Sequence, residues 1–393
     1  MQKTSQLSGI TALRLFAAVA VIIGHIEMMK KVFNLSTLWY DLNNIYTLAP
    51  ITYILQGKMV WNAPLISHLG FNAVVFFFVL SGFLITHVLI QETNTKGSFS
   101  IPSFYWRRII RIWPLYLFIV LLAFGIGAID WSDFNYPNQP EWLSQRGFVA
   151  TCHFLFSPNI ALLFVPAIGM VGHLWSIGVE EHFYLFWPWL LKIIKKKKNQ
   201  ILAFGAIWIL AKIILKLLIL SFDLPLQSIA LYLIFNKFEC MALGGYLAYV
   251  FNEKNSKIKS YILKNLTRLL IANLLLFFVA TYFLAEKWAN FNYLLVALFS
   301  GLLLFRVTQS DEKSFLNHRW INILGNASYA VYIVHFPILL FILNTQFYTG
   351  HFTALGWKEN IGLYTEVIFS SLAFGLFLHT FIESPIKKWS QRI

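Results

Sequence analysis

Long apolar stretches follow one another along almost the whole chain and are separated by short polar connections. About ten of these windows are long enough to cross a bilayer, because roughly 20 apolar residues span its hydrocarbon core: 10–29, 67–90, 109–129, 172–194, 200–221, 226–252, 264–284, 288–306, 321–345 and 362–382. The pattern predicts an all-α polytopic membrane protein with about ten transmembrane helices. A further apolar segment, Cys152–Ile168, contains two prolines, and we expect it to be interfacial or re-entrant.

The composition favours a membrane protein over a soluble one. The chain has 393 residues, of which 58% are hydrophobic and only 12% are charged. A soluble domain carries about 25% charged residues, so this deficit fits a chain that is largely surrounded by lipid. No cleavable signal peptide is evident, because the first apolar stretch contains Arg14 and no small-residue cleavage site follows it. We therefore expect one integral-membrane domain over residues 1–393.

The net charge of +14 could indicate a nucleic-acid partner, but its distribution indicates membrane topology instead. With a cytoplasmic start, the inside connections hold about two thirds of the basic residues, whereas Lys30 and Lys31 are among the few outside. This positive-inside asymmetry predicts that both termini are cytoplasmic. The run KIIKKKKNQ, residues 192–200, is interpreted as a topology anchor rather than a site for nucleic acid or anionic lipid.

Ionisable residues inside the apolar windows are costly in lipid and by default suggest function. Arg14 and His25 share the first window and lie about three helical turns apart, so they project from nearly the same face. Counted by helical rise, His25, His335 and Glu180 fall in one layer of the outer half of the bilayer. Three windows that place acid–base groups at one depth favour a shared site over separate packing contacts.

The adjacent carboxylates Glu180 and Glu181 point about 100° apart on a helix, so at most one of them faces a given site. A Glu–His pair would fix the imidazole tautomer and raise its basicity, and we assign this role to Glu180 with His25. Glu181 is expected to pair with another segment, near a Tyr hydroxyl or a Trp N–H group. His153, in an outer connection, is expected to be solvated.

Other charges in the apolar windows are weaker candidates. Lys212 and Lys216 share one face of the fifth window, and Lys237 and Glu239 lie in the sixth. These groups either pair between helices, which we favour, or line an aqueous cavity for an anionic group.

The stretch SFYWRRIIRIWPLY places Arg108 and Arg111 on one side of a helix at the cytoplasmic mouth. The pair is either a topology anchor or a phosphate clamp, because guanidinium groups suit phosphate oxygens. Cys152 and Cys240 lie far apart and support neither a disulfide framework nor a zinc site, so no metal is expected.

Six segments together resemble the acyltransferase 3 family, the membrane-bound O-acyltransferases that modify bacterial surface glycans. The resemblance covers nearly the whole chain in the expected order, although His182 stands where the family often has Gln. The segments are GITALRLFAAVAVIIGH with Arg14 and His25, FNAVVFFFVLSGFLIT from Phe71 to Thr86, YWRRIIRIWPLY with Arg108, Arg111 and Pro114, HLWSIGVEEHFYLFWPWLL with Trp175, Ser176, Glu180, Glu181, Phe183 and Tyr184, LGNASYAVYIVHFPILL with Ser328, Tyr329, Tyr332, His335 and Pro337, and FIESPIKKW with Glu383, Pro385 and Lys387.

The resemblance implies a multi-pass enzyme of the bacterial cytoplasmic (inner) membrane. It would take cytoplasmic acyl-CoA, usually acetyl-CoA, and acylate a sugar hydroxyl of an extracytoplasmic or lipid-linked glycan, without the added esterase-like domain of many relatives. His25 would act as general base and Glu180 would orient it, while His335 or Tyr184 would donate to the developing oxyanion. The residues expected to bind acyl-CoA are Arg14, Arg108 and Arg111, and those expected to line the substrate path are Ser81, Gly82, Trp175, Tyr184 and Tyr332.

The main rival function is that of a proton-coupled transporter or flippase, whose relays use the same residue types. Arg108 and Arg111, together with the lack of detectable inverted repeats, favour the enzyme. A purely structural membrane subunit is disfavoured by the number of ionisable groups in the apolar windows. The sequence leaves open the acceptor, the acyl chain, the oligomeric state, and the choice between direct transfer and an acyl-enzyme intermediate, in which a side chain such as that of His25 briefly carries the acyl group.

Overall fold

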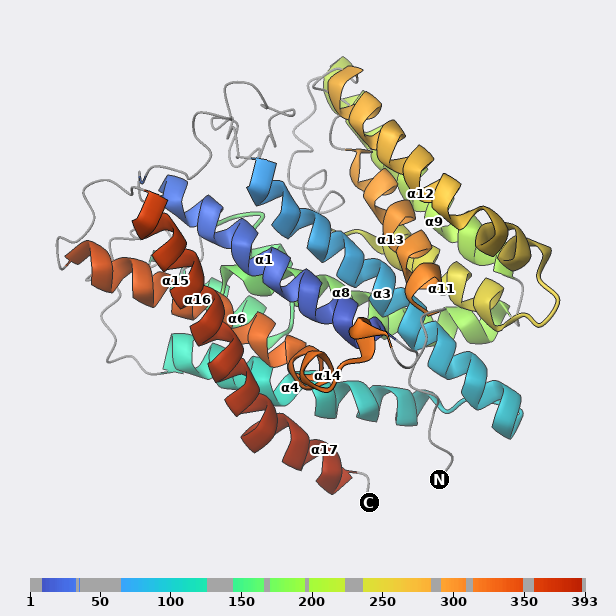
Figure 1. The fold of residues 1–393 in the computed structure, drawn as a ribbon. Coiled ribbons are helices and arrows are strands. Elements are labelled where there is room, and N and C mark those ends of the chain that lie inside the picture. The colour runs from blue at the N-terminus through green and yellow to red at the C-terminus, as the bar shows by residue number, and fades with distance from the viewer. Residues whose placement is uncertain are drawn as a thin grey trace. The chain divides into compact units, whose positions relative to one another are not determined.

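A computed structural model describes the chain at residues 9–32, 35, 65–125, 144–165, 170–194, 198–222, 236–283, 291–308, 314–348 and 357–390. Every regular element in these residues is helical, which confirms the all-α prediction for this part of the chain (Figure 1). Those long and apolar enough to cross a membrane are Ile10–Lys30, Leu69–Lys96, Lys198–Ile219, Lys257–Phe277, Ser328–Gln346 and Trp357–Ser390. Six candidate spans support a membrane protein, whereas the number ten and the orientation of the termini stay predictions.

Each predicted apolar window overlaps at least one described helix. The longer helices are α1 (Ile10–Val32), α3 (Leu65–Lys96), α4 (Ile101–Gly125), α8 (Trp175–Ile194), α9 (Lys198–Phe222), α11 (Phe238–Asn252), α12 (Lys257–Phe283), α13 (Tyr293–Val307), α15 (Ser328–Tyr348) and α16 (Trp357–Leu378). Shorter elements are α6 (Arg146–Phe154), α7 (Pro158–Ala161), the 3-10 turn η2 (Gly172–Leu174), the 3-10 turn η4 (Phe315–Asn317), α14 (Arg319–Asn326), the π-helical turn η5 (His379–Glu383) and α17 (Ser384–Ser390).

The contacts between helices divide the chain into two compact units. The first unit consists of Met1–Ala17, Asn72–Ile101 and Phe183–Asn326, and the second consists of Ala18–Phe71, Pro102–His182 and Ala327–Ile393. Helices α1, α3 and α8 each contribute residues to both units.

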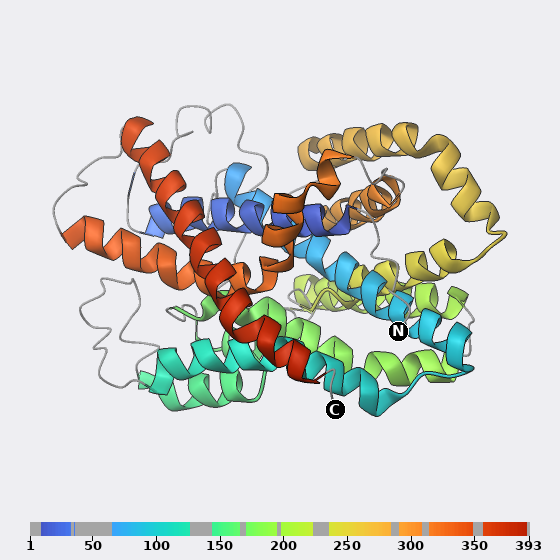
Figure 2. The same ribbon diagram turned by 60° about the horizontal axis from the view of Figure 1, so that its bottom comes forward.

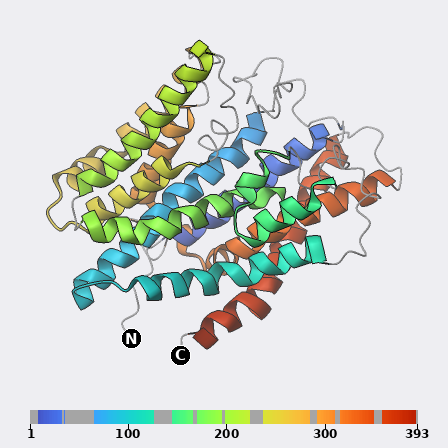
Figure 3. The same cartoon turned by 180° about the vertical axis from the view of Figure 1, so that it is seen from behind.

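In the first unit, α9 packs against α11 and α12 packs against α13 (Figure 3). Glycines bring α3 and α11 together, because a Cβ on Gly82 would lie 1.9 Å from the carbonyl oxygen of Met241 and one on Gly244 would lie 2.0 Å from that of Val79. Small residues commonly allow such close approach between membrane helices. The expectation that Gly82 leaves room for a substrate is therefore wrong, since the backbone of α11 occupies this space.

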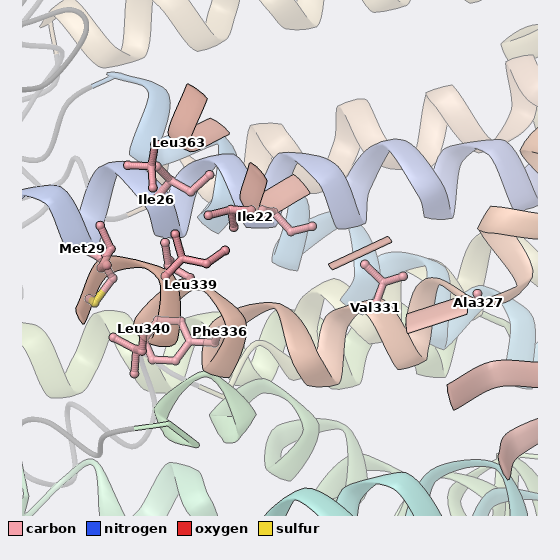
Figure 4. Close-up of a cluster of buried hydrophobic side chains, with 12 residues drawn as sticks. Ile22, Ile26, Met29, Ala327, Val331, Phe336, Leu339, Leu340 and Leu363 are labelled. Carbon is pink, nitrogen blue, oxygen red and sulfur yellow. The ribbon is translucent and has the colours of Figure 1, made fainter. Parts of the chain in front are cut away.

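In the second unit, α16 crosses α15 and continues through the π-helical turn into α17 as one long run (Figure 2). Ile22 and Ile26, one turn apart on α1, face Phe336 and Leu339 of α15 in a buried apolar cluster (Figure 4). The cluster fixes how α1 is rotated against α15, which determines what the polar residues of both helices can reach.

A buried polar group joins α1 to α16 in the same unit. Lys30 is 0% exposed, and its ammonium forms an ion pair with Glu27 on α1 and donates to Asn360 Oδ1 on α16 at 2.5 Å. The Tyr364 hydroxyl of α16 also donates to Glu27. Lys30 was expected in an outside connection, but it lies in α1, because this helix extends to Val32 and carries the lysine on its packed side.

Substitution of Lys30 by Met tests this buried pair. Removing one partner of a buried ion pair typically costs roughly 3–5 kcal/mol, because the other charge is left uncompensated. We expect K30M to lower the thermal unfolding midpoint of the purified protein clearly. The double variant E27Q/K30M should recover much of the loss, because it removes both charges. A double variant as unstable as K30M would show that packing rather than charge pairing explains the effect.

Candidate active site

Three histidines from distant parts of the chain meet inside the second unit. His25 of α1 and His335 of α15 are joined by a hydrogen bond of 2.8 Å between Nδ1 and Nε2, and their stacked rings lie 5.0 Å apart. His173 of η2 sets its ring edge-on to that of His335, also at 5.0 Å. Phe336 closes the group, with its ring 5.1 Å from that of His25 and 5.3 Å from that of His173. The predicted meeting of His25 and His335 is therefore found.

The hydrogen bonds determine which ring nitrogens carry protons when the histidine pair is neutral. His335 Nδ1 lies 2.6 Å from the backbone carbonyl oxygen of Tyr332, and since a carbonyl only accepts, this nitrogen carries the proton. His335 Nε2 is then the acceptor, so Nδ1–H of His25 donates to it. His25 is left with Nε2 as its lone-pair nitrogen, which is the protonation state that a general base needs.

Tyr332 connects this pair to the start of α8. Its hydroxyl donates to the carbonyl oxygen of His173 at 2.9 Å and lies 2.7 Å from Ser176 Oγ. Both side chains are buried, and Trp175 beside them is half-buried. His173 and Ser176 of the Trp-Ser…Glu-Glu segment are thus brought together with Tyr332 of the Tyr…His-x-Pro segment.

The two carboxylates of α8, those of Glu180 and Glu181, have different surroundings. Among the residues that the structure describes, His25 is paired with His335 and not with Glu180, so the expected direct Glu180–His25 pair is wrong. Glu180 lies half-buried one helical turn after Ser176, on the same side of α8. Glu181 accepts a hydrogen bond of 3.3 Å from the indole N–H of Trp113 on α4, as predicted for the second carboxylate.

Arg108 and Arg111 lie half-buried on α4 in the same unit. The guanidinium of Arg108 stands over the ring of Phe104 at 5.6 Å. Next to Arg111, the carbonyl oxygen of Ile112 accepts a hydrogen bond of 2.7 Å from the Tyr329 hydroxyl of α15. The two arginines therefore sit on a helix that is tied to the His335 helix, and their role as a phosphate clamp stays a prediction.

The remaining predicted site residues belong to the first unit. Arg14 is half-buried on α1, Ser81 is half-buried on α3, and Tyr184 is buried on α8. Their roles toward a donor or a substrate stay predictions.

Two further buried histidines, His153 and His173, had no role assigned from the sequence. His153 was expected to be solvated, but it is 0% exposed, its Nδ1 donates to the carbonyl oxygen of Val149 at 2.8 Å, and its own carbonyl accepts from Tyr116 at 2.9 Å. The reason is that the outer connection folds as α6 and turns one face inward. His173 carried one usable signal, its position two residues before the Trp175-Ser176 pair.

In the first unit, Lys212 and Glu239 from the fifth and sixth windows pair between helices, as favoured from the sequence. Lys212 of α9 lies 2.5 Å from the Glu239 carboxylate of α11, and the Tyr293 hydroxyl of α13 donates to the same oxygen at 2.5 Å. The ammonium of Lys237 stands 3.6 Å from the centre of the Tyr293 ring. All four side chains are buried, which fits a structural network. In the part of the chain that the structure describes, no group of His, Cys, Asp and Glu is arranged to hold a metal ion.

Comparison with known proteins finds a matching family model and several similar proteins. A family model described as an acyltransferase domain matches residues 7–383. The O-acetyltransferase OatA of Staphylococcus aureus strain NCTC 8325 is 23% identical over 327 residues, which is 81% of this chain and 53% of the relative. A putative O-acetyltransferase of Staphylococcus aureus strain COL is 25% identical over 332 residues, with the same coverage. The chain thus spans about half the length of these relatives. No solved structure matches the chain significantly.

Proposed function

The chain belongs to the acyltransferase 3 family, and from this membership we propose that it is an O-acyltransferase, with acetyl as the first candidate for the group that it transfers. The donor is cytoplasmic acyl-CoA, and the acceptor is a sugar hydroxyl of an extracytoplasmic or lipid-linked glycan. Similarity to proteins named O-acetyltransferases supports the choice of group. The six apolar helices support a place in a membrane, for which we propose the bacterial cytoplasmic membrane.

The histidine pair is the observation that supports this chemistry most directly. His25 donates a hydrogen bond from its Nδ1–H to His335 Nε2. Its own Nε2 thereby keeps a lone pair and is available as a base. In the proposed reaction, the acceptor oxygen attacks the thioester carbonyl while its proton moves to His25 Nε2. The tetrahedral intermediate then expels the CoA thiolate, which takes the same proton. General acid–base help of this kind is typically worth about 10²–10⁴-fold.

His335 fits an orienting role better than the oxyanion role considered from the sequence. Both of its ring nitrogens are already used, Nδ1 for the Tyr332 carbonyl and Nε2 for His25. In the apolar interior a positive imidazolium is costly, and a hydrogen-bonded second ring spreads that charge. We keep Tyr184 as the proposed oxyanion donor and Glu180 as the carboxylate that offsets the positive charge electrostatically.

The proposed donor site uses the basic residues Arg14, Arg108 and Arg111. Guanidinium groups pair with phosphate oxygens through two parallel hydrogen bonds, so arginines suit the phosphates of CoA. Ser81, Trp175 and Tyr332 are proposed to line the substrate path, with Tyr332 held in place by Ser176 and the His173 carbonyl.

A proton-coupled transporter would also use buried histidines. The match of the family model to nearly the whole chain favours acyl transfer, and acetyl-CoA cleavage separates the two functions. Purified protein incubated with radiolabelled acetyl-CoA should release CoA and transfer label to a glycan fraction, whereas a transporter would leave the thioester intact. Mass spectrometry of surface glycans from strains with and without the gene would then identify the acceptor.

Substitution of His25 by Ala tests the assignment of the base. We expect H25A to reduce acyl transfer at least about 10²-fold, because the attacking hydroxyl loses its proton acceptor. The measurement is the rate of CoA release from acetyl-CoA, with membrane insertion and thermal stability followed in parallel. The exposed His318 offers a matched control, and H318A should retain full activity. Wild-type rates in a well-folded H25A protein would reject His25 as the base.

Substitution of Arg111 by Ala tests the donor site. Losing a charge-assisted hydrogen bond of about 1.5–3 kcal/mol should raise the KM for acetyl-CoA about 10- to 100-fold. The KM for the acceptor should change much less, and steady-state kinetics with each substrate varied in turn measures both values. The neighbouring Arg107 is exposed, so R107A is a control for a general loss of positive charge. Equal losses for donor and acceptor in R111A would indicate a structural role instead.

A further inference from the structure

His173 is the histidine of the cluster to which the proposed reaction gives no part. It is 2% exposed and surrounded by rings, with His335 at 5.0 Å, Phe336 at 5.3 Å and Tyr332 at 5.6 Å. A phenylalanine would satisfy such a setting by packing alone. A polar ring at this position therefore requires a reason, since each of its nitrogens must be hydrogen-bonded or remain unsatisfied at a cost.

One ring nitrogen of His173 has a clear structural task. Pro337 lacks a backbone N–H, so the carbonyl of Ile333, one turn earlier on α15, has no helical donor. His173 Nε2 lies 3.1 Å from this carbonyl oxygen and supplies the missing hydrogen bond. Because the carbonyl can only accept, Nε2 carries the proton, and in the neutral ring Nδ1 is left with a lone pair.

The other nitrogen has no such task. Among the described residues, Nδ1 of His173 is buried and has no hydrogen-bond partner. A buried acceptor without a hydrogen bond is destabilising, because it has lost its hydrogen bonds to water. The residue is held at two points, because its ring Nε2 donates to Ile333 and its backbone carbonyl accepts from Tyr332. The lone pair is thus kept in a fixed place beside the His25–His335 pair.

We propose that His173 Nδ1 accepts a hydrogen bond from an N–H or O–H group of a bound substrate, and that His173 is therefore a substrate-binding residue of the acyl-transfer site. This inference rests on the proposed function. Two parts of the reaction offer such a donor, namely a hydroxyl of the acceptor sugar and an amide N–H of the acyl-CoA arm. Either bond would hold its substrate against the rings that orient His25.

Two substitutions separate the two nitrogens of His173. The amide of glutamine reaches the position of Nε2, so H173Q keeps a donor for the Ile333 carbonyl and removes the acceptor at Nδ1. The amide oxygen of asparagine reaches the position of Nδ1, so H173N keeps the acceptor and loses the bond to Ile333. H173Q therefore keeps the structural hydrogen bond and removes the substrate-binding acceptor, whereas H173N does the opposite.

The expected kinetic result distinguishes a substrate-binding residue from a purely structural one. H173Q should raise the KM for one substrate about 2- to 10-fold, the cost of one hydrogen bond, and keep the wild-type unfolding midpoint. H173N should keep that KM closer to wild type and unfold at a lower temperature. The donor is acetyl-CoA and the acceptor is a glycan-lipid extract of the host membranes, each varied in turn. A raised KM for acetyl-CoA identifies the amide N–H, and one for the extract identifies the hydroxyl. H173Q with wild-type KM values for both would overturn the proposal.

A measurement without turnover keeps this inference separate from the proposed function. With ¹⁵N-labelled histidine, the His173 signals are those that H173Q lacks, and the free protein should show one protonated and one lone-pair nitrogen. Acetyl-CoA or the extract, added alone, should shift the lone-pair nitrogen toward the hydrogen-bonded range. A shift in a protein that transfers no acyl group would support the binding role and reject the proposed reaction. Normal transfer with no shift from either substrate would reject the binding role alone.

Discussion

The hydrogen bond between His25 on α1 and His335 on α15 is the interaction on which the proposed chemistry depends. It requires a defined rotation of both helices, which the apolar cluster around Ile22, Ile26 and Leu339 provides. It also requires a defined tautomer of His335, which the Tyr332 carbonyl provides. Packing and backbone geometry together therefore determine where one proton sits, and that proton decides which nitrogen of His25 can act as a base.

A second constraint is that polar backbone groups in an apolar interior need partners. Pro337 breaks the hydrogen-bond ladder of α15 only two residues after His335, and His173 pairs with the carbonyl of Ile333 that is thereby left free. The same residue accepts the Tyr332 hydroxyl through its backbone carbonyl. Helix α15 is thus tied to the turn before α8, which places the His173 imidazole beside that of His335, while Ser176 of α8 contacts Tyr332. The missing helical donor at Pro337 and the position of His173 therefore have one physical cause.

From the sequence, the meeting of His25 and His335 could be predicted, but the surroundings of Glu180 and Lys30 could not. The fixed rise of a helix was enough to place His25 and His335 in one layer, and they do meet. Partners depend on helix rotation and on neighbours that come from elsewhere in the chain. Glu180 was paired with His25 because carboxylates commonly orient imidazoles, yet a second imidazole takes that place. Lys30 was assigned to an outside connection, yet α1 continues past it and Glu27 on the same helix neutralises it.

The long apolar windows by themselves predicted a helical chain suited to a membrane, because a lipid-surrounded backbone must satisfy its hydrogen bonds within each segment. Residue identity also determined that Pro337 must leave the carbonyl of Ile333 without its helical donor. Only the tertiary structure decided that His173, 160 residues away in the chain, would be the donor. The physical reason is that residue identity determines which groups need a hydrogen-bond partner. Side-chain packing between helices determines which group lies close enough to be that partner.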